Sequence, residues 1–338
     1  MKPLQSGRTH TPGMLLALAL VACALLAIGP ARGAPGGPPH YLKSLRVPGA
    51  ADTFKQPLCV HADLHAGEVF VCDRSNNRLV IFDERGLYKY QIIGGSTFAT
   101  PFDLAVDPDG YIMLLALVDG QRAIVRLDYD GRFVEQIALS DLPEGILEPQ
   151  PISIALSPAG DRLYVLDQAN FRLWIADAGG RMTGSVDLVV GQDPKRAREE
   201  ILGHVDTYAD VVLVSRSMAG SVLLLDPDGV SRGTIGIKGT SSCESAFPVA
   251  AALDTSGNVV ILDQQRTLMT VWQTSDRRCV EEISGIGEQP GYLYQPADLT
   301  LDGRGRLYVS QGFEGRVQIF EHQTGAAGPD ARDLVAPR

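Results

Sequence analysis

One pattern recurs six times along the chain and restricts the fold more than any other feature of the sequence. An aromatic residue or Leu stands three positions before a Pro at residues 54–57, 98–101 and 293–296. Short apolar runs and turns follow each of these starts. The six copies, some of them degenerate, begin at Pro57, Pro101, Pro151, His204, Pro248 and Pro296. Repeats of about 40 to 50 residues are typical of propeller blades.

Turn sequences separate the apolar runs inside each copy. DPDG at 107–110 and DTSG at 254–257 have Asp first and Gly fourth. Asp at the first position caps backbone N–H groups, and Gly at the fourth adopts a positive φ. The intervening runs, such as LYVL at 163–166, are apolar enough for strands that are covered on both faces. The sequence therefore predicts an all-β fold, a six-bladed β-propeller of four-stranded antiparallel blades.

The sixth copy contains material for three strands only. Its third strand is expected at 316–321, and the segment YLKSLRV at 41–47 stands before the first copy without a partner. We expect this N-terminal strand to complete the last blade, with a lone N-terminal arm as the alternative. The propeller then spans residues 41–325, and 326–338 form a polar C-terminal tail.

Three segments carry a resemblance to a known family. PFDLAVDPDG at 101–110, DRSNNRL at 73–79 and GYLYQP at 291–296 are similar to repeats of the NHL family of six-bladed propellers. Blade four departs from the pattern at 215–216. The resemblance covers 41–321 and implies a propeller that binds partners, usually proteins and sometimes RNA. Its fold also resembles six-bladed enzymes such as amidating lyases, gluconolactonases and strictosidine-synthase-like proteins, and fold alone does not choose among them.

The charge balance is acidic, with 40 Asp and Glu against 30 Lys and Arg. Binding to a phosphate backbone needs clustered cations, so we expect no nucleic-acid partner. A protein or a small ligand is the expected partner, and we expect the chain to be a monomer.

The first forty residues are typical of an export signal and a flexible lead-in. Lys2 and Arg8 precede sixteen uncharged residues at 14–29, which is shorter than the ~20 residues that span a bilayer. We expect residues 1–33 to be removed, 34–40 to be flexible, and the protein to be periplasmic or extracellular. Two alternatives remain, a lipoprotein modified at Cys23 in the segment LVAC and an uncleaved anchor in the membrane.

Four cysteines remain after removal of the signal, and export favours disulfides. The first hairpin turns near residues 65 and 66, so opposed residues in its two strands have numbers that sum to about 131. Cys59 and Cys72 satisfy this rule and should face each other as a disulfide. Cys243 and Cys279 then form the second pair. The alternative for the first pair is two buried free thiols.

Candidate binding residues come from aligning the six inner strands on the Pro position. The aligned position holds Cys59, Asp103, Ser153, Asp206, Ala250 and Asp298. We expect Asp103, Asp206 and Asp298 to surround one channel mouth, where they could hold a cation or a cationic group. Calcium is also possible at the Asp-x-Asp-Gly turns, and no other cofactor is expected. The alternative is that each Asp accepts backbone N–H bonds from its own loop.

Two functions are consistent with the sequence. The first is a binding scaffold outside the cytoplasm, and the second is a metal-assisted hydrolase or lyase with its site in the channel. Only His61 and His204 could converge on the channel, which is too few for a zinc centre built from several histidines. No Gly-x-Ser-x-Gly elbow is present. The sequence favours the scaffold and predicts no catalytic residue.

Overall fold

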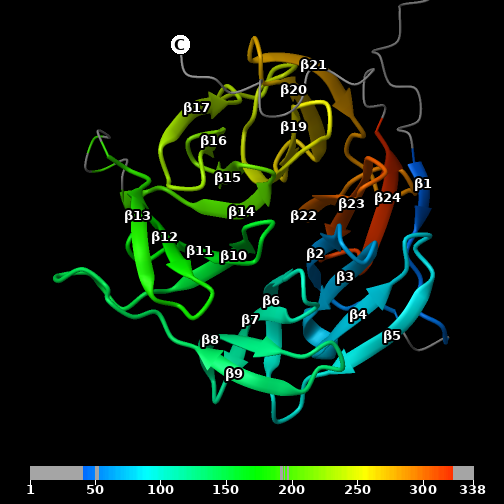
Figure 1. The fold of residues 1–338 in the computed structure, drawn as a ribbon. Helices are drawn as coiled ribbons and strands as arrows, with labels where there is room; N and C mark the ends of the chain where they lie inside the picture. Colours follow the sequence, from blue (N-terminus) through cyan, green and yellow to red (C-terminus); the bar gives the residue numbers. More distant parts are fainter. Residues whose placement is uncertain (1–40, 50–52, 191–192, 194, 196–197, 323–338) are drawn as a thin grey trace, which may run out of the picture. The chain divides into compact units, whose positions relative to one another are not determined.

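The computed structural model describes residues 41–49, 53–190, 193, 195 and 198–322. This part contains six four-stranded antiparallel sheets arranged as blades in a ring (Figure 1). The predicted signal at 1–33, with Cys23, the lead-in at 34–40 and the tail at 326–338 lie outside the described residues. Within the described part, the structure has no helix of the length and apolar character needed to cross a membrane.

The first three blades follow one another along the chain. Blade 1 comprises β2 (Pro57–Asp63), β3 (Glu68–Asp73), β4 (Arg78–Phe82) and β5 (Tyr88–Ile93), with the 3-10 turn η1 (Arg74–Asn76). Blade 2 comprises β6 (Ala99–Val106), β7 (Ile112–Val118), β8 (Gln121–Leu127) and β9 (Phe133–Ile137). Blade 3 comprises β10 (Pro151–Leu156), β11 (Arg162–Asp167), β12 (Arg172–Asp177) and β13 (Met182–Asp187).

The last three blades complete the ring. Blade 4 comprises β14 (Leu202–Tyr208), β15 (Val211–Arg216), β16 (Ser221–Leu225) and β17 (Ser231–Ile235). Blade 5 comprises β18 (Pro248–Leu253), β19 (Asn258–Asp263), β20 (Leu268–Gln273) and β21 (Arg278–Ile283). Blade 6 comprises β22 (Pro296–Leu301), β23 (Arg306–Gln311), β24 (Arg316–Glu321) and the N-terminal β1 (Tyr41–Ser44).

The N-terminal strand closes the ring as the sequence predicts. Strand β1 pairs with β24 so that Lys43 lies opposite Ile319, and the Leu45 N–H continues the pairing by donating to Val317 O at 2.9 Å. Leu45 is 4% exposed and packs against Val317 and Ile319. Blade 6 therefore joins the two ends of the described chain, which leaves no bare edge on β24.

The core consists of six apolar clusters, one at each contact between neighbouring blades. At the contact between blades 1 and 2, Phe70 and Ile81 pack against Leu104 and Leu114. Strands β3 and β4 are buried along their whole length. This explains why residues 69–72 and 79–82 are continuously apolar rather than alternating.

The cysteine register agrees with the prediction, and one of the two disulfides is present. Cys59 lies opposite Cys72 in the β2–β3 pair, and Cys243 is bonded to Cys279. Cys59 and Cys72 are buried free thiols whose Sγ atoms lie 2.6 Å apart. The bond between them is therefore not part of the structure and stays a prediction.

We predict that the protein forms a Cys59–Cys72 disulfide under oxidising conditions, because the two strands already bring both sulfur atoms together. Mass spectrometry of a non-reduced digest should show this linkage beside Cys243–Cys279. Replacing both Cys59 and Cys72 by Ala should cost on the order of 2–3 kcal/mol of stability. Free Cys59, or a Cys59–Cys243 peptide, would contradict the pairing.

Candidate functional site

The first layer of the central channel is formed by one equivalent residue from each inner strand. Pro57, Pro151, Pro248 and Pro296 each lie opposite the last residue of the neighbouring strand, and an irregularity in the pairing follows. In each inner strand, the second residue after the Pro position belongs to this first layer. We call the six residues of the layer the ring. In blade 4, Leu202 takes the Pro position, because it lies opposite Arg216 at the end of β15.

This register places His204, and not Asp206, on the ring. The sequence alignment put His204 in the Pro position, which shifted blade 4 by two residues. Side chains two residues apart in a strand lie on the same face. Asp206 therefore faces the channel as His204 does, but it lies one layer further along the channel. The ring consists of Cys59, Asp103, Ser153, His204, Ala250 and Asp298.

Hydrogen bonds between blades confirm the register of the ring. In each bond, the backbone N–H of the residue after a ring position donates to the polar ring side chain of the preceding blade. Asp298 Oδ2 accepts from Val60 at 2.9 Å, and Asp103 Oδ2 accepts from Ile154 at 2.8 Å. Ser153 Oγ accepts from Val205, the residue after His204, at 3.0 Å. The aspartates thus join neighbouring blades, in addition to any role in binding.

His204 lies between the two ring carboxylates. Its Nε2 is 3.5 Å from Asp103 Oδ2, and its Nδ1 is 3.8 Å from Asp298 Oδ1. Nδ1 is buried and forms no hydrogen bond. Burial alone lowers the pKa of His204, but the charges of Asp298 and Asp103 outweigh it and raise this pKa to about 10. At neutral pH the ring therefore contains an imidazolium between two carboxyl groups.

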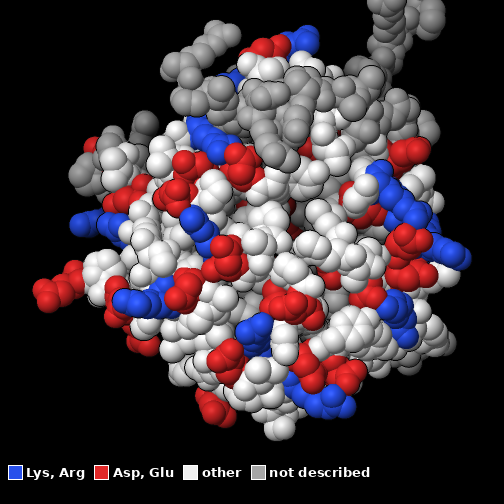
Figure 2. Space-filling model, viewed as in Figure 1, with Lys and Arg blue, Asp and Glu red and all other residues white. Residues whose placement is uncertain are grey.

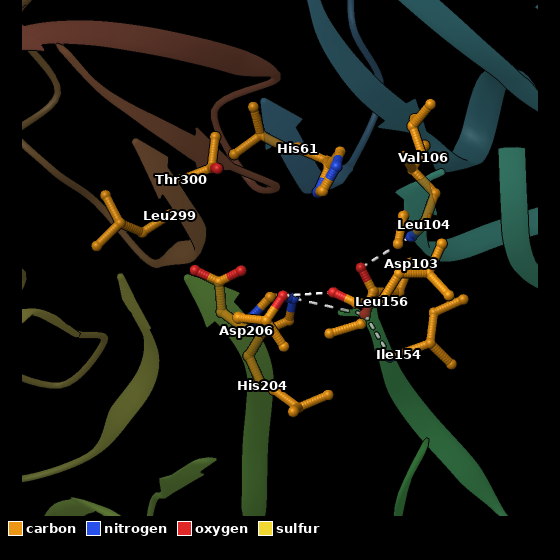
Figure 3. A pocket seen from close by; sticks show the side chains of 15 residues that line it. His61, Asp103, Leu104, Val106, Ile154, Leu156, His204, Asp206, Leu299 and Thr300 are labelled. Atoms are coloured by element: carbon orange, nitrogen blue, oxygen red, sulfur yellow. Dashed lines mark hydrogen bonds and ion pairs between the residues drawn. The ribbon is translucent and has the colours of Figure 1, made fainter. Parts of the chain in front are cut away.

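Asp206 and His61 belong to the layer below the ring. Both side chains face the channel there, together with Thr300 (Figure 3). Burial raises the pKa of Asp206 to about 6, and burial also lowers the pKa of His61. Asp206 was predicted to surround the channel mouth together with Asp103 and Asp298, but it lies one layer deeper and does not share their hydrogen bonds to a neighbouring blade.

Three cavities follow one another along the channel. A mouth cavity of about 230 Å³ touches Asp103, His204 and Asp298. A central cavity of about 40 Å³ is shared by Asp103 and His204 with His61 and Asp206. A third cavity of about 350 Å³ begins at His61 and Asp206. The walls of the mouth cavity include the apolar residues Leu58, Phe102, Ile152, Ile201, Phe247 and Val249, and its exposed lining is about equally polar and apolar.

Three ring atoms are close enough to hold a metal ion. Cys59 Sγ and carboxylate oxygens of Asp103 and Asp298 lie within 4.8 Å of one another. However, burial raises the pKa of the Cys59 thiol well above its ordinary value, and a neutral thiol is a poor metal ligand. Calcium takes six to eight oxygen ligands, and the ring offers two carboxylates. The ring suits an N–H cation better, since it already holds the imidazolium of His204.

Sequence reasoning missed the place of His204, although a usable signal was present. The turn at 209–210 gives opposed residues in blade 4 a sum of 419, as in the pair Val205 and Val214. This sum places His204 level with Ser215, as the sum of 131 places Cys59 opposite Cys72. The same rule that gave the cysteine register therefore identifies His204 as the ring residue. The absent Pro in blade 4 concealed it.

Comparisons with known proteins agree with the fold. No protein-family model and no curated protein matches the chain. A Bacteroides thetaiotaomicron protein of unknown function has a TM-score of 0.59 at 15% identity, covering 80% of this chain and 70% of that one. Kuenenia stuttgartiensis hydrazine synthase has a TM-score of 0.57 at 13% identity, covering 83% and 100%.

A lyase is also among the similar structures. A catalytically inactive virginiamycin B lyase from Staphylococcus aureus, with quinupristin, has a TM-score of 0.55 at 14% identity and covers 82% of this chain and 83% of that one. At these identities the similarity shows the propeller fold alone. The six-bladed propeller is confirmed, and the likeness to the NHL family remains a resemblance.

Proposed function

We propose that the chain is exported and acts as a binding propeller whose ligand places a positively charged group at the ring. The observation that carries this proposal is the arrangement of Asp103, His204 and Asp298 at the floor of the mouth cavity. Apolar side chains around a few convergent charged groups are typical of a small-molecule site.

The net charge of the ring favours a cation. Burial works against ionisation of Asp103, but the charge of His204 outweighs it and lowers the pKa of this carboxyl. Burial raises the pKa of Asp298 to about 6. At pH 7 both carboxyl groups are largely ionised against one imidazolium, and Asp206 adds negative charge in the next layer. The excess of negative charge is poorly solvated, so a cation from the mouth cavity stabilises it.

The surface charge is consistent with a ligand other than nucleic acid. In Figure 2, Lys and Arg side chains are intermixed with Asp and Glu over the visible face, which has no continuous basic surface. Together with the net charge of −10, this favours a small ligand over a phosphate backbone.

Butylammonium is the probe for this site, with butanol as its uncharged counterpart. We expect saturable binding of butylammonium by calorimetry or ligand-observed NMR, and at least a tenfold loss of affinity in Asp298→Asn. The Asn side chain keeps an oxygen for the Val60 N–H, so the blade contact persists. Asp130→Asn, at a 63% exposed side chain, is the control and should bind as the wild type does. Equal binding of butanol, or an unchanged affinity in Asp298→Asn, would contradict the proposal.

A second candidate function is an enzyme with its site in the channel. Its support is that the pKa values of Asp206 and Asp298 lie at about 6, a range suited to general acids and bases. A metal-assisted hydrolase or lyase would further require bound metal. Stoichiometric Ca or Zn in elemental analysis, or cleavage of quinupristin that Asp206→Asn abolishes, would favour this enzyme over the binding propeller.

The proposed location outside the cytoplasm depends on the N-terminal 33 residues. N-terminal sequencing and mass spectrometry of the exported protein distinguish a soluble form from a lipidated form. A chain beginning at Ala34 indicates a soluble protein, whereas a lipidated Cys23 indicates a propeller tethered to a membrane.

A further inference from the structure

Two arginines beside the mouth cavity form an arrangement that cation binding at the ring does not explain. The aromatic ring of Phe102, which lines the mouth cavity, lies 4.9 Å from Arg74 Cζ and 4.4 Å from Arg122 Cζ. Arg74 begins η1 in blade 1, and Arg122 belongs to β8 in blade 2. We call Arg74, Phe102 and Arg122 the arginine clamp.

The clamp differs from the other cations that lie on aromatic rings in the described part of the chain. Each of the others also has a carboxylate partner: Lys89 on Tyr129 has Glu68, Arg126 on Tyr111 has Asp107, Arg172 on Trp174 has Asp187, and Arg306 on Tyr308 has Asp302. Among the described residues, neither Arg74 nor Arg122 forms an ion pair with a carboxylate. Burial, and after it the charge of Arg74, lowers the pKa of Arg122, so the two guanidiniums repel each other.

The unpaired guanidiniums have hydrogen-bonding capacity for an anion. One Arg122 N–H group, on Nη1, donates to Pro151 O at 2.8 Å. A guanidinium presents five N–H donors in a planar fork that matches a carboxylate or a phosphate. An anion between the two arginines would remove their repulsion. Arg122 is exposed and Arg74 is half-buried, so both guanidiniums are accessible to an anion from solvent.

We propose that the arginine clamp binds the anionic group, a carboxylate or a phosphate, of the same small ligand whose positive group lies at the ring. This inference rests on the proposed function. Asp103 directly follows Phe102, and both line the mouth cavity of about 230 Å³. The two arginines contact the Phe102 ring outside this lining, so the ligand would extend from the cavity past Phe102 to reach them. The ligand is therefore a zwitterion with its charges at opposite ends.

The test compares probes of matched length on the wild type and on two variants. The probes are ω-amino carboxylates of three to eight carbons, the alkylammonium and alkylcarboxylate ions of the same lengths, and 3-aminopropylphosphonate. The double variant Arg74→Gln/Arg122→Gln removes both charges of the clamp, and thermal unfolding shows whether it is folded. Arg132→Gln is the control, because Arg132 lies in blade 2 with a 74% exposed side chain paired to Asp130.

We expect one length of amino carboxylate to bind at least tenfold more tightly than the alkylammonium of that length. The double variant should lose this advantage and keep alkylammonium binding, and Arg132→Gln should keep both. The phosphonate shows whether a carboxylate or a phosphate fits better. The absence of any advantage, or an advantage that survives in the double variant, overturns the inference but not the proposed function. Failure of every alkylammonium to bind the wild type overturns the proposed function, and with it the zwitterionic ligand.

Discussion

Deletion of residues 41–47 is expected to lower the midpoint of thermal unfolding by roughly 10 °C or more. The deletion removes β1, which leaves the edge of β24 unpaired and uncovers Val317 and Ile319 where Leu45 packs. Scanning calorimetry on the deleted and intact propeller measures the difference. An unchanged midpoint would show that β1 does not close the ring.

Two point variants show which residue of the segment 41–47 carries the stabilisation. Leu45→Ala should cost about 2–5 kcal/mol, because its side chain is 4% exposed in a packed cluster. Leu42→Ala is the matched control, since Leu42 is 46% exposed and should cost about 0.5 kcal/mol or less. Equal losses in the two variants would contradict the packing of this segment.

Replacing His204 by Gln should destabilise the fold at neutral pH by about 3–5 kcal/mol, because Asp103 and Asp298 lose their counter-ion. The loss should depend on pH. The pKa of His204 is raised from 6.5 to about 10 by folding, so the native state holds an extra proton between these values. Its stabilisation is present below pH 6.5 and is lost as pH rises through 10. Below pH 6, protonation of Asp298 removes part of the pairing as well.

Chemical unfolding at several pH values measures this dependence. The difference in unfolding free energy between wild type and His204→Gln should be largest near neutral pH and should shrink toward pH 10. His65→Gln, at an exposed turn, should follow the wild type throughout. Adding Asp298→Asn to His204→Gln should restore part of the loss, because one uncompensated charge is removed. Parallel curves for wild type and His204→Gln between pH 7 and 10 would contradict the ion pairing.

The fold was predictable because its signals are local. The DPDG and DTSG turns and the apolar runs between them specify hairpins, and their repetition specifies blades. The closing strand follows from a sixth copy that is one strand short. Even the facing of Cys59 and Cys72 follows from the turn position alone. Each of these inferences needs only the chemistry of a few neighbouring residues.

Only part of the site was predicted, because the register of the ring depends on one irregular blade. Asp103 and Asp298 each stand two residues after a Pro, and both lie on the ring. Blade 4 has Leu202 where the other starts have Pro, so Asp206 was assigned in place of His204. The raised pKa of His204 could not be read from the sequence, because it arises from carboxylates about 100 residues away on either side. The arginine clamp likewise joins three separate segments.

The protonation state of His204 tests the account most directly. NMR titration of the imidazole nitrogens, assigned with His204→Gln, measures its pKa with and without saturating butylammonium. We predict a pKa of about 10 for the free protein and a lower value with the probe, because a second cation at the ring disfavours the imidazolium. A pKa near 6.5 that does not change with butylammonium would contradict both the charged ring and its role in binding a cation.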